Sequence, residues 1–375
     1  MSEPTRRVLH LIDHESASWP VLHAMDVLRR ADTDEARPHR HDVVLIGGTD
    51  AHQRALQLGL DCCDRINAPQ GLLRAASVTL RRTVEAHGTP DAVISWSAAA
   101  SAIAARAGIG ARRVAVMTQS PRSAMNSMAR RSLARSLESA AVLHISQAVL
   151  NRWTQALGAA ASGLVAPLPV EPQLLDAAPR AEVRAGWGMN DQTSVVMGSG
   201  EPDSAIDGRL MAYQVGVLTI AGRTAAAVLP VGARDVERGL RFTLRHEKPW
   251  RLILEPRAPW GCLAGCDAAL WCTERTHASG IPSRRPAPGA AGLAWAAAAG
   301  VPIVAEDCDA SREAVGDGGA HWAKAGSALS INRALLRALT DTGANAPIVD
   351  AARRHVMARH TPAGWIAAVR RSIDG

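Results

Sequence analysis

The residues of this chain best suited to bind a ligand lie in the segment 292–319, which reads GLAWAAAAGVPIVAEDCDASREAVGDGG. Its alanine-rich first part predicts a helix, and Gly300 predicts a tight turn. The apolar run 301–305 predicts a buried strand. The polar loop 306–311 follows that strand directly. Ligands of open parallel sheets bind outside the carboxyl ends of the strands, so we predict a ligand site at this loop. Its backbone amides could cradle a phosphate if they open a helix.

Apolar runs that alternate with helical patterns indicate which elements position this loop. Strands are predicted over 8–12, 41–46 and 91–95, and a second series begins with 194–198 and 215–220. Such alternation is typical of the α/β class, in which helices cover both faces of a parallel sheet.

Two domains are expected from the length of 375 residues. The proline-rich stretch 167–172 resembles an extended linker. We therefore predict one Rossmann-like domain over 1–168 and a second over 169–346, followed by helices over 347–375.

Cysteine usage and hydropathy indicate a cytoplasmic protein. The six cysteines form no CxxC pair, so we expect buried free thiols and no metal site. The sequence contains no run of about 18 apolar residues, and MSEPTRRVLHLI lacks the apolar core of a signal peptide.

The formal charge of +7 comes almost entirely from arginine, because Lys248 and Lys324 are the only lysines. Scattered arginine pairs fit either a solvated basic surface or contact with anionic lipids or phosphates. The ten tryptophans are dispersed, which argues against a stacking surface for nucleic acid. No nucleic-acid partner is therefore expected.

The segment 292–319 resembles the donor-sugar half of GT-B glycosyltransferases, family 4 in particular. Those chains carry a helix, G-V-P-V-V-A, a small-residue loop and E-[IV]-V. Further similar stretches occur in the same order, namely TPDAVISWS (89–97), HISQAVLNRWTQALG (144–158), RAEVRAGWGMNDQTSVVMGSGEP (180–202) and ARRHVMARHTPAGWIAAV (352–369). The resemblance implies two Rossmann-like domains facing across a cleft, with the C-terminal helices returning to the N-terminal domain.

The resemblance also implies which residues would bind a nucleotide-sugar donor. By position these are Ser199, Gly200, Arg209, Arg257, Asp307, Cys308, Asp309, Ala310 and Glu313. Glu313 fits either donor contact or helix capping. The family supplies an arginine and a lysine just after its first donor-domain strand, where a departing diphosphate must be neutralised. Here that loop contains three acids, no lysine and, late in the loop, only Arg209.

Other family positions are substituted in this chain. Trp295 and Ala287 stand where the family has two glutamates that hold the donor sugar and ribose. On the acceptor side, Trp96 stands where the family often has a histidine, and His14 and Ser16 lie in the loop after the first strand. The resemblance therefore assigns no catalytic residue.

Two functions fit these observations. The first is a hexosyl-type glycosyltransferase that uses a nucleotide sugar as substrate, needs no cofactor or metal, and acts on a lipid-linked or polysaccharide acceptor. The second is a catalytically silent GT-B protein that serves as a binding or partner subunit. A dinucleotide-dependent oxidoreductase is excluded, because no G-x-G-x-x-G follows the first strand.

The segment 123–137 has apolar residues at helical spacing, Met125, Met128, Leu133 and Leu137, flanked by arginines. Such a helix can lie on an anionic bilayer, which would place the protein peripherally at the inner membrane face. A helix packed on its own sheet has the same pattern, so both interpretations stay open.

Overall fold

The computed structural model divides into two compact units. The N-terminal unit comprises Met1–Pro169 and Pro362–Gly375, and the C-terminal unit comprises Val170–Thr361. The first division lies one residue from the predicted boundary, within the proline-rich stretch. The described residues are 6–14, 16–33, 40–60, 62–66, 73–121, 125–176, 178–199, 208–231, 233, 236–244, 251–272 and 290–374.

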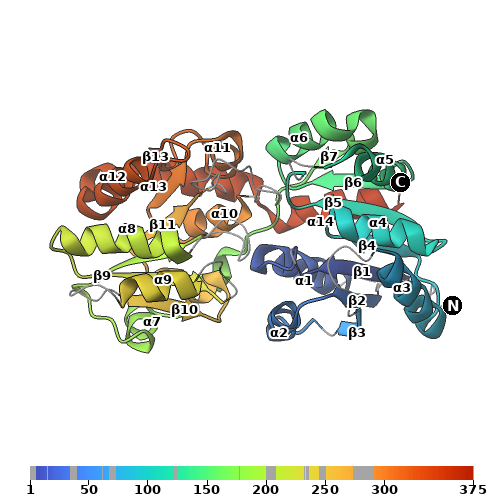
Figure 1. The fold of residues 1–375 in the computed structure, drawn as a ribbon, viewed down its shortest axis with the longest axis horizontal. Helices are drawn as coiled ribbons and strands as arrows, with labels where there is room; N and C mark the ends of the chain where they lie inside the picture. Colours follow the sequence, from blue (N-terminus) through green and yellow to red (C-terminus); the bar gives the residue numbers. More distant parts are fainter. Residues whose placement is uncertain are drawn as a thin grey trace. The chain divides into compact units, whose positions relative to one another are not determined.

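The N-terminal unit is built on a parallel sheet (Figure 1), and most residues of its central strands are buried. In sheet order the described strands are β3 (Cys62–Ile66), β2 (Arg40–Ile46), β1 (Arg7–Asp13), β4 (Ala92–Ser95), β5 (Arg112–Met117), β6 (Ala140–His144) and β7 (Leu164–Val165). The chain changes direction across the sheet between β1 and β4, which makes their carboxyl ends the point where a crevice is expected.

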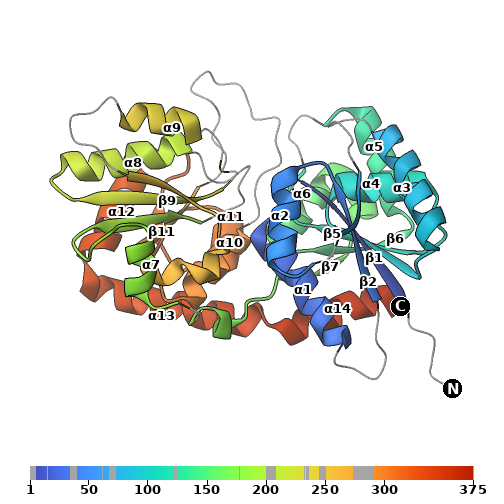
Figure 2. The same cartoon turned by 90° about the horizontal axis from the view of Figure 1, so that it is seen from below.

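Helices cover both faces of this sheet, as the α/β prediction requires. The described helices are α1 (Trp19–Thr33), α2 (Thr49–Gln57), α3 (Leu73–His87), α4 (Ala98–Ala107), α5 (Ser127–Leu137), α6 (Gln147–Leu157), the short η1 (Gly158–Ala161) and α14 (Pro362–Asp374). α1 and α14 lie together on one face, and α3 and α4 lie on the other (Figure 2).

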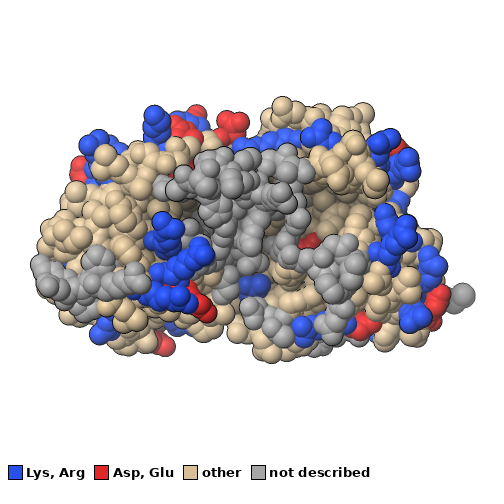
Figure 3. Space-filling view, in the orientation of Figure 1, with Lys and Arg blue, Asp and Glu red and all other residues tan. Residues whose placement is uncertain are grey.

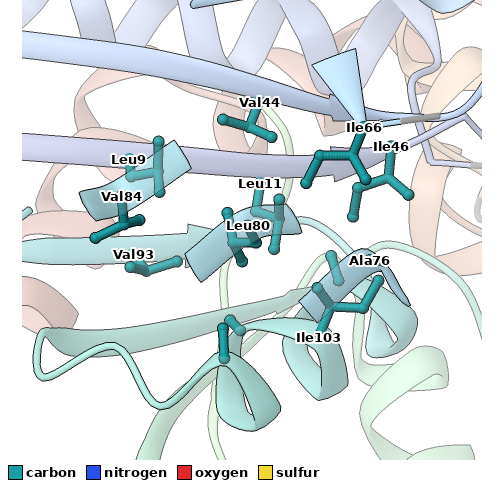
Figure 4. Packing of buried hydrophobic residues seen from close by; sticks show 13 residues of the cluster. Leu9, Leu11, Val44, Ile46, Ile66, Ala76, Leu80, Val84, Val93 and Ile103 are labelled. Atoms are coloured by element: carbon teal, nitrogen blue, oxygen red, sulfur yellow. The ribbon is translucent and has the colours of Figure 1, made fainter. Parts of the chain in front are cut away.

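Packing against α3 and α4 forms a large apolar core in this unit (Figure 4). Leu9, Leu11 and Val44 project from the sheet toward Leu80 of α3 and Ile103 of α4. All five are at most 2% exposed. Because β1 lies at the centre of this core, its carboxyl end is held rigidly.

The C-terminal unit repeats the design with a second parallel sheet. In sheet order the described strands are β10 (Arg251–Glu255), β9 (Ala225–Pro230), β8 (Ser194–Gly198), β11 (Ala268–Trp271), β12 (Ile303–Glu306) and β13 (His321–Ala323). Direction changes between β8 and β11, so the expected crevice lies at their carboxyl ends.

Two helical layers enclose this second sheet. α8 (Gly208–Ile220), α9 (Val236–Thr243) and α12 (Ala328–Thr340) cover one face, while α7 (Arg180–Gly186), α10 (Ala291–Ala298) and α13 (Thr342–Arg359) cover the other (Figure 2). The remaining described elements are α11 (Asp309–Val315), η2 (Pro172–Leu174), η3 (Pro259–Gly261) and η4 (Leu263–Gly265).

The predicted strand over 215–220 is wrong, because these residues form the second half of α8. The β-branched residues there favour a strand locally. Met211, Val215 and Leu218 recur at helical spacing, however, and all three are buried. Tertiary burial of that stripe overrides the local preference.

The predicted segment 347–375 is divided between the two units. α13 packs on α10 and α11 through a face that includes Ala352 and Val356, so it belongs to the C-terminal unit. α14 alone joins the N-terminal unit, where Trp365 and Val369 are buried. No helix of the described residues is long and apolar enough to cross a membrane.

Candidate functional site

The candidate donor site lies at the carboxyl edge of the C-terminal sheet. Ser199 follows β8 directly, is 6% exposed, and donates its amide N–H to the carbonyl of Leu270 at 2.8 Å. It thereby links the start of the loop after β8 to strand β11. Gly200 and Ala287 lie outside the described residues. Arg209 is exposed in the first turn of α8.

The loop after β12 is held by the hydroxyl of Ser311. This hydroxyl donates to the Glu306 carbonyl at 2.6 Å and accepts the amide N–H of Cys308 at 3.2 Å. The loop therefore opens α11 in a fixed geometry. The amides of Asp309 and Ala310, in the first turn of α11, have no acceptor among the described residues, as is usual at a helix start. They could accept an anionic group.

Asp307 is neutralised by a neighbour on α11. Arg312 contacts both of its carboxylate oxygens, at 2.6 and 2.9 Å, and also reaches Asp317 at 2.9 Å. Hydrogen bonding to Arg312 lowers the pKa of Asp307. The guanidinium also lies 4.9 Å from the ring centroid of Trp322. Because Arg312 is committed to these partners, it is not a free cation for a diphosphate.

Glu313 does not cap a helix, because it lies in the middle of α11. Its carboxylate lies 3.4 Å from Arg359 of α13, and its side chain is 14% exposed. The structure therefore gives it an ion-pair partner on the neighbouring helix.

Arg257 is likewise committed to a partner. Its guanidinium donates to both carboxylate oxygens of the buried Glu255, at 2.8 and 2.7 Å, and the indole of Trp187 donates to the same carboxylate at 2.7 Å. Burial alone would raise the pKa of Glu255, but these hydrogen bonds outweigh it and lower that pKa. Contact of Arg257 with a nucleobase would require it to leave this pair.

Trp295, at the family's second glutamate position, lies inside the C-terminal unit. It is 1% exposed, and its ring centroid lies 4.4 Å from that of Trp260. An indole packed in this way cannot replace a carboxylate that accepts hydrogen bonds from sugar hydroxyls. Binding of a sugar donor in this unit would therefore need other groups.

Lys324 is a candidate that sequence reasoning missed. It follows β13, beside the start of the β12 loop, because the amide N–H of Asp307 donates to the carbonyl of Ala323 at 2.8 Å. Its side chain is exposed and forms no ion pair with the described residues. Its rarity as one of two lysines was the available signal.

At the corresponding crevice of the N-terminal unit, Asp13 connects the ends of β1 and β4. It accepts the hydroxyl of Ser97 and, at 2.9 Å, the amide N–H of Ser16. Ser97 in turn caps α4. Ser16 is only 3% exposed, so it supports this junction. Asp13 was also missed, because an acid at the end of a strand has no distinctive spacing.

His14 is half-buried against the glycine turn after β2. Gly48 has φ +62°, and a Cβ atom there would lie 2.7 Å from the Cβ of His14. The turn therefore needs glycine both for its conformation and for this close approach.

Trp96 lies in the core rather than on a surface, with 0% of its area exposed. Its indole N–H donates to Nδ1 of His10 at 3.1 Å, and Nε2 of His10 lies 2.8 Å from Nδ1 of His41. Nε2 of His41 lies 2.8 Å from Asp32, which also accepts two hydrogen bonds from Arg370. One consistent assignment makes both histidines neutral and protonated on Nε2. The hydrogen-bonded series Trp96–His10–His41–Asp32–Arg370, here called the histidine relay, links α14 to the N-terminal sheet.

Burial, and secondarily the nearby His41, hold the pKa of His10 well below its ordinary value. An unfolded histidine titrates near pH 6.5, so below that pH the unfolded state takes up a proton that the folded state does not. We expect stability to be full above about pH 6.5 and to fall toward pH 5 by about 1.4 kcal/mol per pH unit for this residue. Urea unfolding at several pH values measures the slope.

The slope should be shallower in His10→Gln. The slope of the unchanged protein must be compared with that of His10→Gln, because burial also lowers the pKa of His144. His144 therefore adds a similar dependence of stability on pH to both proteins. Equal slopes would show that His10 is not the buried neutral group described here.

Comparisons with known proteins establish the fold. No protein-family model matches the chain, and no curated protein matches it in sequence. HepE from Anabaena, solved in complex with UDP-glucose, matches with a TM-score of 0.75 and 16% identity, over 98% of this chain and 99% of its own.

Two further structures match over nearly their full length. A glycosyltransferase from Rickettsia africae ESF-5 has a TM-score of 0.71 and 11% identity, over 98% of both chains. Sucrose-phosphate synthase from Thermosynechococcus elongatus has a TM-score of 0.69 and 11% identity, again over 98% of both. These likenesses and the two parallel sheets confirm the predicted GT-B fold.

Proposed function

We propose that this protein is a glycosyltransferase that transfers a sugar, of hexosyl type, from a nucleotide-sugar donor to an acceptor. The observation that carries the proposal is the full-length likeness to glycosyltransferases, including one solved with UDP-glucose. The nucleotide sugar is the substrate, and no further cofactor is expected. Among the described residues, no group of three His, Cys, Asp or Glu side chains could hold a metal ion.

The donor is proposed to bind at the carboxyl edge of the C-terminal sheet. The unoccupied amides of Asp309 and Ala310 and the exposed Lys324 supply positive potential there. Arg312 screens Asp307, which would otherwise repel a diphosphate. Stabilisation of the leaving diphosphate is the contribution these groups can make to transfer.

A nucleotide titration tests this proposal. The full chain is titrated with UDP, GDP and ADP and with their sugar conjugates, by thermal shift. A ligand that binds only the native state stabilises it by about 2.7 kcal/mol at a hundredfold excess over its Kd, so one nucleotide should give a clear shift. Loss of one charge-assisted contact in Lys324→Gln should weaken that nucleotide about tenfold. Arg333→Gln, an exposed change on α12, should not weaken it.

The buried Trp295 favours a second candidate function, a GT-B protein that binds partners without transferring sugar. The same samples distinguish the two. Release of free nucleoside diphosphate from the bound nucleotide sugar supports transfer chemistry. A bound nucleotide sugar that stays intact with lipid-linked and polysaccharide acceptors supports the silent function. No shift with any nucleotide at millimolar concentration contradicts the proposed donor.

A lipid-linked acceptor would be reached through peripheral membrane contact, and α5 is the proposed surface. Residues 101–169 contain eight arginines and one glutamate, whereas the rest of the chain has equal numbers of basic and acidic residues. Leu133 and Leu137 pack within the unit, while Met128 is 75% exposed beside the exposed Arg130, Arg131 and Arg135. Basic side chains gather over α3, α4 and α5 on the face in Figure 3.

Binding to vesicles that contain phosphatidylglycerol tests this surface. Each arginine near an anionic surface contributes about 1 kcal/mol, so changing Arg130, Arg131 and Arg135 to glutamine should weaken binding about a hundredfold. The matched control changes Arg333, Arg337 and Arg353, which are exposed in the C-terminal unit. Equal binding of the two triple variants would exclude α5 as the contact.

We further propose that the protein acts in the cytoplasm. Cys262, Cys266 and Cys308 are free thiols, as a reducing compartment favours. Burial raises the pKa of Cys262 and Cys266, so these two are unreactive core residues. The side chains of Cys62 and Cys63 lie outside the description. Cell fractionation tests this location. Detection of the protein in a membrane-free cytoplasmic fraction supports the proposal, and detection in an extracellular fraction contradicts it.

A further inference from the structure

A polar pocket lies at the amino edge of the C-terminal sheet, at the opposite end of the strands from the proposed donor site. Its volume is about 600 Å³, and its lining includes Gly188, Asn190, Thr193, Arg223, Thr224 and Arg251. These residues precede or begin β8, β9 and β10. Strands of five or six residues separate the two edges by roughly 15 Å. The pocket is large enough for a small organic ligand.

The residues that line this pocket carry a net positive charge. Its lining contains two arginines and no carboxylate. Arg223 has no ion pair or side-chain hydrogen bond there. Arg251 donates one N–H to the carbonyl of Gly188 at 2.9 Å, which leaves its other N–H groups for a ligand. Gly188 has φ +64°, and a Cβ atom there would lie 3.2 Å from Arg251, so glycine allows this approach.

Several hydrogen-bond acceptors around the pocket are already occupied. The buried Arg184 takes the carbonyls of Asn190, at 3.0 Å, and Thr193. The side-chain oxygen of Asn190 accepts from Gln192 and Thr193, at 3.1 and 3.0 Å. The amide N–H of Ser194 takes the carbonyl of Thr224 at 2.8 Å.

The last carbonyls of α8 are capped in the same way. The amide N–H groups of Gly222 and Arg223 donate to Thr219 and Leu218, at 3.0 and 3.1 Å. Capping reduces the negative potential at this helix end. The pocket is therefore rich in unused donors and poor in unused acceptors, which is the chemistry that recognises an anion.

We propose that this pocket binds a small phosphate-bearing ligand, with Arg223 and Arg251 as its principal contacts. Guanidinium groups suit a phosphate because their planar N–H groups can donate in pairs. The amide nitrogen of Asn190 and the hydroxyl of Thr224 would serve the remainder of the ligand. This site is separate from the donor site and does not depend on transferase activity.

Titration of the full chain with inorganic phosphate and with glucose 6-phosphate tests the proposal, with glucose as the neutral control. At low salt at least one of the two phosphates should bind saturably, and glucose should not. Arg223→Gln and Arg251→Gln should each weaken that binding about tenfold or more. Thr224→Glu, which adds a carboxylate at an exposed position, should weaken it through repulsion.

Two controls separate this site from the donor site. Arg333→Gln, outside the pocket, should bind the phosphate as the unchanged protein does. All three pocket variants should keep the unfolding temperature of the unliganded protein and its response to nucleotides. Failure of both phosphates to bind at millimolar concentration would overturn the proposal. So would binding that the three pocket variants leave unchanged, because the ligand would then lie elsewhere.

Discussion

Replacing Arg184 by methionine is expected to destabilise the C-terminal unit by about 3 kcal/mol or more. Arg184 is 1% exposed, and its guanidinium donates to the carbonyl of Gly265 at 3.1 Å and to Asp267 at 3.2 Å. It also takes the carbonyls of Asn190 and Thr193. Methionine fills similar volume but donates no hydrogen bond. The carbonyls would lose this donor and Asp267 would lose one of its two arginine partners, and underpaired buried acceptors are costly.

Arg180→Met is the matched control for this change. Arg180 pairs with the same Asp267 at 2.5 Å, but 43% of its side chain is exposed. Exposed ion pairs contribute about 1 kcal/mol or less, so this variant should lose little. Urea unfolding, monitored by hydrogen exchange of the amides in β8 and β11, measures the loss of unfolding free energy in both variants. Similar losses in the two variants would contradict the special role of the buried guanidinium.

Trp365→Ala is expected to destabilise the N-terminal unit by about 3–5 kcal/mol. Trp365 is 1% exposed, its ring centroid lies 5.8 Å from that of Trp96, and its indole N–H donates to the carbonyl of Ala24 at 3.0 Å. Alanine would leave a cavity between α14 and α1, and the Ala24 carbonyl, which lies inside α1, would keep only its helical hydrogen bond. Because α14 carries Arg370 of the histidine relay, that hydrogen-bonded chain should weaken too.

The unfolding transition of the N-terminal unit measures the effect, and Arg371→Ala on the same helix is the control. Arg371 is exposed, so its loss should stay within about 0.5 kcal/mol. A small effect of Trp365→Ala would show that α14 is not essential to this unit. In that case the division of the C-terminal helices between the two units would need revision.

The parallel sheets, and with them the carboxyl edge at which the donor is proposed to bind, could be predicted from sequence because they depend on local patterns. The buried strand that ends at Glu306, and the glycine turn that precedes this strand, can both be recognised in the sequence. Once a parallel sheet is inferred, the carboxyl ends of its strands must share one edge. The likeness to GT-B enzymes rests on the order of such pieces, which is why it holds over the whole chain at low identity.

The state of individual side chains could not be predicted, because it depends on which groups fold beside them. Arg257 and Arg312 are adequate phosphate ligands as residue types, but Glu255 and Asp307 occupy them. Trp96 directly follows β4, where a ligand would approach, but His10 of the neighbouring strand β1 accepts its indole N–H. Lys324 became a candidate ligand only because β13 pairs with β12, which places Lys324 beside the loop that opens α11.

The pocket at the amino edge illustrates the same limit. Arg223 precedes β9 and Arg251 begins β10, so no sequence motif contains both residues. Only the alignment of β8, β9 and β10 in one sheet brings their loops together.

Hydrogen exchange measured by mass spectrometry, with and without the nucleotide sugar that shifts the unfolding temperature, tests whether the donor binds at the carboxyl edge of the C-terminal sheet. We expect slower exchange in residues 306–313 and 323–326, because the ligand would occupy the amides of α11 and the loop after β13. Residues 188–193 at the opposite edge should exchange unchanged. Unchanged exchange at 306–313 under saturating nucleotide sugar would contradict the proposed donor site and, with it, the assignment of these residues to sugar transfer.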